Sequence, residues 1–421
     1  MKSKIFSITS LIMILILAIT ITGCSNTDDP DKESSQSSES SDEIDQTKEE
    51  TEEASLEEET ETKEVVEGSQ AIIDNLSTEG GIKDVYEQVD LLAGTCLSET
   101  MINNEQYENL IKENFTSITL ENDMKPEAIL NKAASIEAGD LVVKFPEKTI
   151  DLLDWAKEND MSARGHVLVW YSQTPDWIFY EDFDESGDLV DRDTLLNRMD
   201  SYIKQVFDLL DELGYSDMFH GYDVVNEAIL DDGSLRDCYW KEIIGDDYIW
   251  HAFNYTDKYA PEHIKLYYND FNEQFKTQAI IDLANDLVDE DGESLIDGIG
   301  CQGHLYTRDS IDQYVLMLKS FSSLGLDVQI TELDISLGTW ENVLEATEEN
   351  LVDQGKYYYE FVSKIVRENL DGNTNVSGIT FWGFDDGLSW RHDRSPLLYN
   401  GVSNPKYSYY GAKLDKDNAG Y

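Results

Sequence analysis

The stretch Tyr222-Asp223-Val224-Val225-Asn226-Glu227 decides how this chain is best interpreted. Its valines favour a short buried strand, because β-branched side chains suit a pleated surface. The strand ends in an amide followed by a carboxylate, and burying either group is costly without a partner. A second apolar run, at 328–331, leads into Glu332 and Asp334. We therefore expect two carboxylic acids, Glu227 and Glu332, at two strand ends. A reaction that uses a general acid beside a nucleophile requires at least such a pair.

The separation of these two glutamates indicates a barrel. They are 105 residues apart (332 minus 227), which is three units of 35. A (β/α)8 barrel spends roughly 30–40 residues on each strand-plus-helix unit. Two strand ends three units apart would then face each other across the barrel mouth. The alternative is that both are ordinary surface glutamates, the commonest fate of this residue type, but such glutamates seldom end apolar strands.

Eight strand-like runs alternate with amphipathic stretches, so the sequence predicts an α/β fold, a (β/α)8 TIM barrel. We assign the barrel to residues 70–415, followed by a short tail at 416–421. Helical patterns include 149–159, 195–213 and 355–368. The predicted strands are 92–95, 117–120, 165–170, 221–226, 264–268, 298–301, 328–331 and 378–382.

Polar or aromatic residues follow nearly every predicted strand. In a (β/α)8 barrel the active site is built from the carboxyl ends of the strands. One polar end means little, but seven together predict a single site. The ends are Glu121-Asn122, Trp170-Tyr171-Ser172-Gln173, Asn226-Glu227, Asn269-Asp270, Gln302-Gly303-His304, Glu332 and Trp382.

The composition argues against two classes of partner. A formal net charge of −56 would repel nucleic acid and anionic lipid. A neutral or weakly charged substrate fits better. The 8 Trp and 23 Tyr would suit stacking against sugar rings, and they would equally suit an ordinary core.

The amino terminus predicts export. Lys2 and Lys4 precede an apolar run from about 11 to 21, which is typical of a signal peptide over 1–23. The ending Ile21-Thr22-Gly23-Cys24 resembles a bacterial lipobox, which would make Cys24 the lipidated first residue of the mature protein. The alternative is a plain secretory signal. We expect the protein to be anchored at the extracellular face of a bacterial cell membrane, or to be secreted if the lipobox is not used.

Residues 24–69 are rich in Glu, Asp, Ser and Thr and poor in large apolar side chains. Such a segment cannot bury enough surface to offset its ordering entropy, so we predict a disordered acidic tether. An acidic tail that binds a basic partner is the alternative use. Of the remaining cysteines, Cys96 and Cys301 lie in apolar runs and should be buried thiols, while Cys238 leaves the number odd. We predict no disulfide, and no spacing typical of a zinc site is present.

Six motifs in this order carry a resemblance to a known family. The chain resembles the family 10 glycoside hydrolases, which are mostly endo-β-1,4-xylanases, over roughly residues 80–412. Each motif is weak alone, but the set is specific. The motifs are Glu121-Asn122-Asp123-Met124-Lys125, Gly165-His166-Val167-Leu168-Val169-Trp170, Asp223-Val224-Val225-Asn226-Glu227, Gln302-Gly303-His304, Thr331-Glu332-Leu333-Asp334 and Trp382-Gly383-Phe384.

The resemblance implies that Glu332 is the nucleophile and Glu227 the acid/base. It also places His304 between Glu332 and Asp334, so that Asp334 orients the imidazole and His304 keeps Glu332 ionised and aimed. The alternative for His304 is a core histidine satisfied by backbone. Asn226 would hydrogen-bond the 2-hydroxyl of the reacting sugar, an interaction that strengthens in the transition state.

Further positions match residues that contact substrate in the family. Gln302 would lie near the reacting sugar, and Trp382 and Trp390 would wall that sugar and its neighbour, with core packing as the alternative for each tryptophan. Two departures stand out, because Tyr171 replaces a usual His and Tyr222 replaces a common Trp. The positions matching non-reducing-side subsites are Glu121, Asn122, Lys125, His166, Trp170 and Gln173.

The sequence therefore predicts a lipid-anchored, retaining endo-β-1,4-xylanase. We expect a monomer that acts on xylan and xylo-oligosaccharides, uses no cofactor or metal, and contacts the membrane only through its lipid. One alternative is a relative that acts on mixed β-glucans or aryl cellobiosides. Another is a non-catalytic, surface glycan-binding lipoprotein, which would have no need of the two glutamates.

Overall fold

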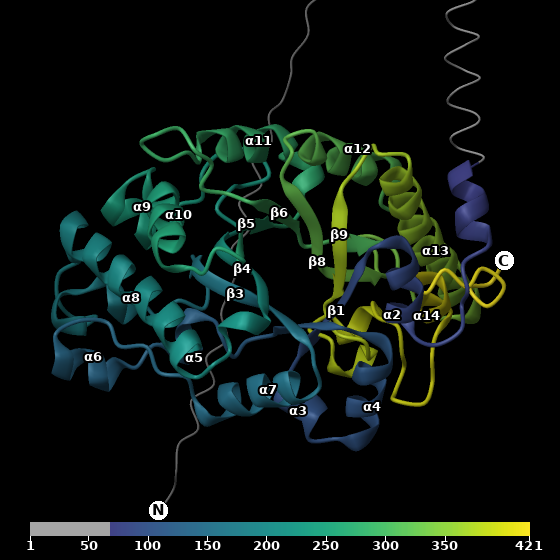
Figure 1. Cartoon of the computed structure of the whole chain (residues 1–421), viewed down its shortest axis with the longest axis horizontal. Coiled ribbons are helices and arrows are strands. Elements are labelled where there is room, and N and C mark those ends of the chain that lie inside the picture. The colour runs from purple at the N-terminus through teal and green to yellow at the C-terminus, as the bar shows by residue number, and fades with distance from the viewer. Residues whose placement is uncertain (1–67) are drawn as a thin grey trace, which may run out of the picture. The chain divides into compact units, whose positions relative to one another are not determined.

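A computed structural model describes residues 68–421 of the chain, and Figure 1 shows its arrangement. The predicted signal peptide, the lipidation site at Cys24 and nearly all of the predicted tether lie outside these residues. The predicted tether extends two residues too far, because a helix occupies 68–74. Within the described part, no helix is both long and apolar enough to cross a bilayer.

Eight parallel strands close into a barrel, which confirms the predicted fold. Each of these eight strands pairs with the next of the eight, so that β6 pairs with β8, and β9 pairs back with β1. A ninth strand, β7, is a short addition at the rim that pairs only with the upper end of β8. The strands are β1 Leu92–Leu97, β2 Ser117–Leu120, β3 Ser162–Trp170, β4 Phe219–Asn226, β5 Lys265–Asp270, β6 Gly298–Cys301, β7 His304–Tyr306, β8 Asp327–Ser336 and β9 Val376–Phe381.

Strand β4 is held by side chains on both of its faces. Val224 and Val225 are buried, as expected for a strand in a parallel barrel that helices cover. Tyr222 is also buried, and its ring lies so close to Gly165 of β3 that a Cβ atom there would sit 2.2 Å from it. Glycine at 165 is therefore required by the aromatic residue on the neighbouring strand.

Helices surround the barrel because one face of each is apolar. In α8 the buried residues Leu195, Met199, Tyr202, Val206 and Leu210 recur every three or four positions. The helices are α2 Ile82–Tyr86, α3 Glu99–Ile102, α4 Glu105–Asn114, α5 Pro126–Ile129, α6 Lys132–Ala138, α7 Glu147–Glu158, α8 Arg192–Glu212, α9 Tyr239–Ile244, α10 Tyr248–Tyr259, α11 Thr277–Asp286, α12 Ile311–Ser322, α13 Glu348–Leu370 and α14 Tyr407–Ala412.

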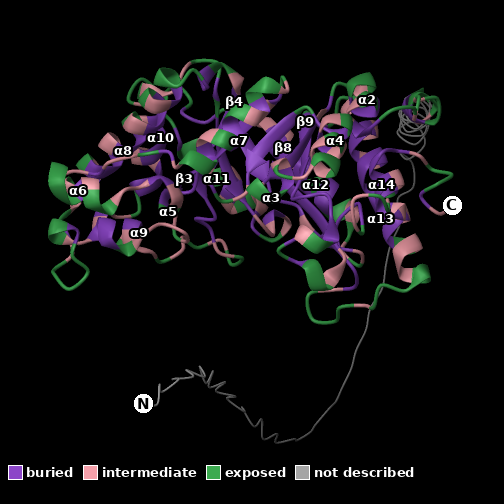
Figure 2. Cartoon of the chain, turned by 90° about the horizontal axis from the view of Figure 1, so that it is seen from below, coloured by how far each residue is buried: buried purple, intermediate pink, exposed green. Residues whose placement is uncertain are grey.

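Burial follows this layering, since the strands are buried and the helices expose their outer faces (Figure 2). Cys96 and Cys301 are buried free thiols in strands, and Cys238 is a partly exposed free thiol. The prediction of a separate tail at 416–421 is wrong. Ala419 is fully buried. The Tyr421 ring packs against the ring of Tyr359 on α13, with 5.3 Å between the two ring centroids. The end of the chain is therefore part of the folded domain.

Candidate active site

A cleft of about 1020 Å³ lies at the carboxyl ends of the barrel strands. Of the site residues predicted within 68–421, all line this cleft except Asp334, which is fully buried behind His304. The structure thus brings the predicted residues together around one opening. Those at the cleft are Glu121, Asn122, Lys125, His166, Trp170, Gln173, Asn226, Glu227, Gln302, His304, Glu332, Trp382 and Trp390.

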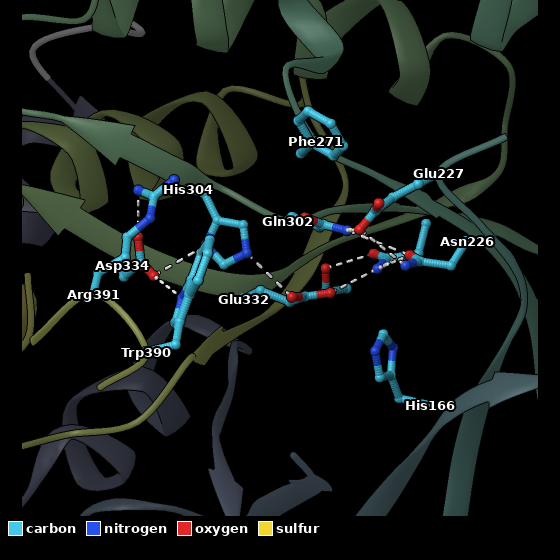
Figure 3. Close-up of polar contacts among 12 residues, drawn as sticks. His166, Asn226, Glu227, Phe271, Gln302, His304, Glu332, Asp334, Trp390 and Arg391 are labelled. Atoms are coloured by element: carbon cyan, nitrogen blue, oxygen red, sulfur yellow. Dashed lines mark hydrogen bonds and ion pairs between the residues drawn. The ribbon is translucent and has the colours of Figure 1, made fainter. Parts of the chain in front are cut away.

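One side of the cleft floor is a carboxylate–imidazole–carboxylate array (Figure 3). His304 Nε2 lies 3.2 Å from Glu332 Oε2, and His304 Nδ1 lies 3.0 Å from Asp334 Oδ2. Burial opposes protonation of the imidazole, but the negative charge of Asp334 and the two hydrogen bonds outweigh it and raise the pKa of His304 to about 9. At neutral pH the ring is therefore an imidazolium that donates to both carboxylates.

This array holds Glu332 in its ionised form. Burial raises the pKa of Glu332, but the hydrogen bond from His304, the positive charge of nearby histidines and a hydrogen bond from Asn269 outweigh it, so the pKa lies below its ordinary value. Asn269 Nδ2 lies 2.8 Å from Glu332 Oε1. An ionised, oriented and nearly buried carboxylate has the properties of a nucleophile.

Asp334 is fixed by two further donors that the sequence did not single out for this contact. Trp390 Nε1 donates to Oδ2 at 2.9 Å, and Arg391 Nη1 donates to Oδ1 at 3.0 Å (Figure 3). Burial raises the pKa of Asp334, yet the charges of His304 and Arg391 bring it below its ordinary value. The negative charge of Asp334, which orients His304, is thus balanced in part by the guanidinium of Arg391.

Glu227 is held on the other side of the cleft by amides. Gln302 Nε2 donates to Glu227 Oε1 at 2.9 Å, and Asn226 Nδ2 donates to the same oxygen at 3.1 Å. Asn226 Oδ1 in turn accepts from Asn269 Nδ2 at 2.9 Å. Because Asn269 also donates to Glu332, the two amides Asn226 and Asn269 form a bridge between the two carboxylates.

The backbone of Glu227 adopts an unusual conformation. Its φ is +57°, in the left-handed region that non-glycine residues seldom occupy. The Glu227 N–H donates to the Asn269 carbonyl at 2.9 Å, and Arg236 Nε donates to the Glu227 carbonyl at 2.8 Å. Residues in such conformations gather at functional sites, where the surroundings hold them.

Polar side chains from the ends of β2 and β3 make a second network in the same cleft. Lys125 Nζ donates to Gln173 Oε1 at 2.8 Å and to Asn122 Oδ1 at 3.1 Å. The same ammonium group lies 5.0 Å from the centroid of the Trp170 ring. Burial raises the pKa of the adjacent Glu121 and lowers that of Lys125. Fixed donors, acceptors and an aromatic face on one wall are what the hydroxyls and ring of a sugar require.

Comparison with known proteins agrees with this geometry. The family model described as Glycosyl hydrolase family 10 matches residues 81–414. The chain belongs to glycosyl hydrolase family 10. The family covers the whole barrel, so the cleft described above is the candidate active site of a family 10 enzyme.

The chain matches named relatives over different fractions of their length. Endo-1,4-beta-xylanase B of Butyrivibrio fibrisolvens is 33% identical over 78% of this chain and 52% of that protein. A putative endo-1,4-beta-xylanase of Caldicellulosiruptor saccharolyticus is 38% identical over 69% of this chain and 97% of that protein. The chain therefore spans about half the length of the first relative and nearly all of the second.

A solved structure has the same fold. It contains the N-terminal modules of an endo-1,4-beta-D-xylanase from Clostridium thermocellum in complex with xylohexaose. The TM-score is 0.69 at 32% identity, covering 77% of this chain and 65% of that one.

Tyr171, the main departure from the family 10 pattern, lies beside Glu227 in the cleft. Burial and the nearby negative charge of Glu227 raise the pKa of Tyr171. The Arg236 guanidinium lies 4.2 Å from the centroid of its ring. Arg236 therefore links the phenol to the backbone of Glu227, a connection that the sequence did not predict.

The other residues missed at this family 10 site lie on loops or on neighbouring strands. Asn269 ends a predicted strand but had no assigned role. Its pairing with Asn226 in the β4–β5 register is the signal that could have identified it. Arg391 directly follows a predicted tryptophan, whereas nothing in the local pattern indicates Arg236. Across residues 68–421, no group of three or more His, Cys, Asp or Glu side chains is arranged to hold a metal ion.

Proposed function

We propose that this protein is a retaining endo-β-1,4-xylanase, with Glu332 as nucleophile and Glu227 as acid/base. The observation that carries the proposal is the contrast between the two carboxylates. Glu332 receives hydrogen bonds from the imidazolium of His304 and from Asn269, which favour its anion. Glu227 instead receives hydrogen bonds from the neutral amides of Asn226 and Gln302, both on one oxygen. Two carboxyl groups with different surroundings can take different roles in one reaction.

In the first step Glu332 attacks the anomeric carbon of the bound sugar, and the glycosidic bond breaks. Glu227 gives its proton to the departing oxygen, so the leaving chain departs as a neutral alcohol. Because Gln302 and Asn226 both donate to Oε1 of Glu227, its other oxygen is left to carry this proton. The product is a covalent glycosyl-enzyme on Glu332.

In the second step water attacks the same carbon while Glu227, now ionised, accepts one of its protons. The bond to Glu332 breaks, the nucleophile returns as an anion, and Glu227 is again protonated. Two displacements at one carbon retain its configuration.

Asn226 is placed to assist both displacements. Its oxygen accepts from Asn269 and Gln302, and one of its two N–H groups donates to Glu227. The second N–H is available for the 2-hydroxyl of the reacting sugar. Trp382 and Trp390 lie at the cleft, where their faces can wall that sugar.

The names of the relatives favour xylan as the substrate of this protein. Two relatives at 33% and 38% identity carry xylanase names, and the compared structure binds xylohexaose. A β-glucan is the second candidate, because a relative of Acetivibrio thermocellus that is 31% identical over 75% of this chain and 28% of its own length is named an exoglucanase.

Parallel digestion of xylan, barley β-glucan and carboxymethylcellulose, with sizing of the products, tests the proposal. We expect a ladder of short xylo-oligosaccharides that appears early in the digestion, as internal cleavage requires. Glu332→Gln keeps the shape of the site but removes the nucleophile, and it serves as the inactive control. Release of glucan products with intact xylan would favour the second candidate. Binding to xylan without any product would favour a glycan-binding protein.

The surroundings of the enzyme are also part of the proposal. We propose that Cys24 carries a lipid, that residues 24–69 tether the barrel away from a bacterial membrane, and that the protein acts as a monomer. The order of basic start, apolar run and Gly23-Cys24 supports the anchor. The acidic, apolar-poor composition supports the tether.

A further inference from the structure

A second cavity, of about 420 Å³, lies on the outside of the barrel. Its walls come from the helix at 68–74, from α12 and α13, and from Lys416 near the end of the chain. Both α12 and α13 belong to the outer layer of helices (Figure 1), and the cavity shares no lining residue with the active-site cleft. The mechanism proposed above therefore makes no use of it.

The charges that line this cavity balance. Three cations and three carboxylates face it, although the chain as a whole carries a formal net charge of −56. A site for a phosphate would need an excess of cations, and a site for a divalent metal ion would need an excess of carboxylates. Donors and acceptors side by side in one cavity instead suit a neutral molecule with many hydroxyls. The charged side chains are Asp74, Asp312, Glu360, Lys364, Arg367 and Lys416.

Contacts within the walls of the cavity hold several of these groups in place. Gln70 Nε2 donates to Asp74 Oδ1 at 2.9 Å, and Arg367 Nη1 donates to Gln70 Oε1 at 3.3 Å. The Lys364 ammonium group donates to Asp312, which joins α13 to the start of α12. Polar groups that are positioned before a ligand arrives lose less freedom when the ligand binds.

An exposed tyrosine stands at the rim of the cavity. Tyr421 is 51% exposed, and within residues 68–421 it is the one aromatic side chain more than a third exposed that does not line the active-site cleft. Its hydroxyl donates to Glu360 Oε1 at 2.8 Å. Its ring centroid lies 5.3 Å from that of Tyr359 and 5.4 Å from the Lys416 ammonium group. Because all three partners line the cavity, the ring is held beside it with one face free for a ligand.

We propose that this cavity and the Tyr421 ring form a second binding site for the polysaccharide, separate from the site of cleavage. The inference rests on the function proposed above, which identifies that polysaccharide as xylan. An exposed aromatic ring can cover the C–H face of a pyranose, and fixed polar groups beside it can bind the hydroxyls. A chain held there keeps the enzyme on its substrate between cleavages, which raises the effective concentration of xylan at the cleft. A substrate too short to reach both sites gains nothing.

The test separates binding from cleavage. In a Glu332→Gln background, which leaves the substrate intact, we would measure retention of the full-length protein on insoluble xylan. In the active enzyme we would measure the rate of product release from insoluble xylan and kcat/KM for 4-nitrophenyl xylobioside.

Two variants alter the cavity and a third is the matched control. Tyr421→Ala removes the exposed ring, and the double variant Glu360→Gln/Lys416→Met removes two charges while keeping most of the side-chain volume. The control is the double variant Lys204→Met/Asp208→Asn, which removes an exposed ion pair on α8. Lys204 is a suitable match because its ammonium group also lies beside a tyrosine ring, 5.9 Å from the centroid of Tyr259.

We expect each cavity variant to lower both retention and the rate on insoluble xylan about threefold or more, with kcat/KM for 4-nitrophenyl xylobioside unchanged, because only long chains reach both sites. The control should match wild type in all three measurements. Wild-type retention and rates in both cavity variants would overturn the second site and leave the proposed function standing. An equal fall with the short substrate would also overturn it, since the cavity does not reach the cleft. A wild type that releases no product from xylan would instead overturn the proposed function, while retention of the Glu332→Gln proteins would still decide the second site.

Discussion

Replacing Asp334 with asparagine tests whether a buried anion keeps the nucleophile ready. Asp334 is fully buried and accepts hydrogen bonds from His304, Trp390 and Arg391 at 2.9–3.0 Å. Asparagine has nearly the same shape. It removes the negative charge and replaces one acceptor oxygen with a donor, so the electrostatic support of His304 is lost while the packing is retained.

The structure sets the size of the expected effect. A pKa of about 9 for His304, against an ordinary value of 6.5, means that the site favours the imidazolium by roughly 3 kcal/mol. The charge of Asp334 is the largest of the contributions that raise this pKa. We therefore expect Asp334→Asn to lower the pKa of His304 by about two units or more, to neutrality or below, so that much of the ring is neutral in the assay. Glu332 then loses a charged donor, so its own pKa rises and attack at neutral pH slows about tenfold or more, which is about 1.4 kcal/mol.

The assay is the pH dependence of kcat/KM with 4-nitrophenyl xylobioside, whose good leaving group isolates attack by Glu332. In Asp334→Asn the acidic limb of the profile should move to higher pH, and an NMR titration should show the lower pKa of His304. Asp312→Asn makes the same chemical change at an exposed position on α12 and should keep the wild-type profile. If Asp334→Asn is folded by circular dichroism and keeps both limbs of the profile, the electrostatic role argued here is wrong.

Five other substitutions test four separate features. With azide and an activated xyloside, Glu227→Ala should give the β-glycosyl azide with retention, and Glu332→Ala the α-azide by direct inversion; the opposite products by proton NMR would reverse the two roles. Tyr171→His adds a group that titrates near neutrality, so the pH–rate profile should shift with activity kept within about tenfold, and complete inactivation would contradict this. Glu273 is buried with a pKa raised to about 8, so the folded state keeps a proton that the unfolded chain releases above pH 4.5, and stability should fall by a few kcal/mol from pH 4.5 to 8. Glu273→Gln should reduce that fall in urea unfolding, and an unchanged slope would argue against it. Cys24→Ala should move the full-length protein from the detergent phase to the aqueous phase, and unchanged partitioning would exclude a lipid at that residue.

The strands and the placement of Glu227 and Glu332 at one cleft could be predicted from the sequence because their signals are local. Runs such as 221–226 and 328–331 combine β-branched residues with a polar end, and the spacing of Glu227 and Glu332 fits the repeat of a barrel. All eight barrel strands lie where these patterns predict them, within a few residues at each end.

The remaining parts of the site depend on contacts between distant segments. β7 follows Gly303 as only three residues, which is too short for a periodic pattern. Arg236 and Arg391 act on residues that other segments bring to them, and a single arginine gives no sign of its partner. The tail prediction failed for the same reason, because only the packing of Ala419 and Tyr421 against α13 shows that the end of the chain is folded.

The amide bridge between Glu227 and Glu332 has a consequence for where protons can travel. Asn226 and Asn269 connect the carboxylates through hydrogen bonds, but an amide N–H does not ionise at any pH that a protein tolerates. The bridge therefore transmits orientation and insulates the two acids from direct proton exchange. In the mechanism proposed above, a histidine or a water molecule in the same place would let the proton of Glu227 pass to Glu332 before the sugar arrives. With amides there, that proton leaves Glu227 toward substrate or solvent.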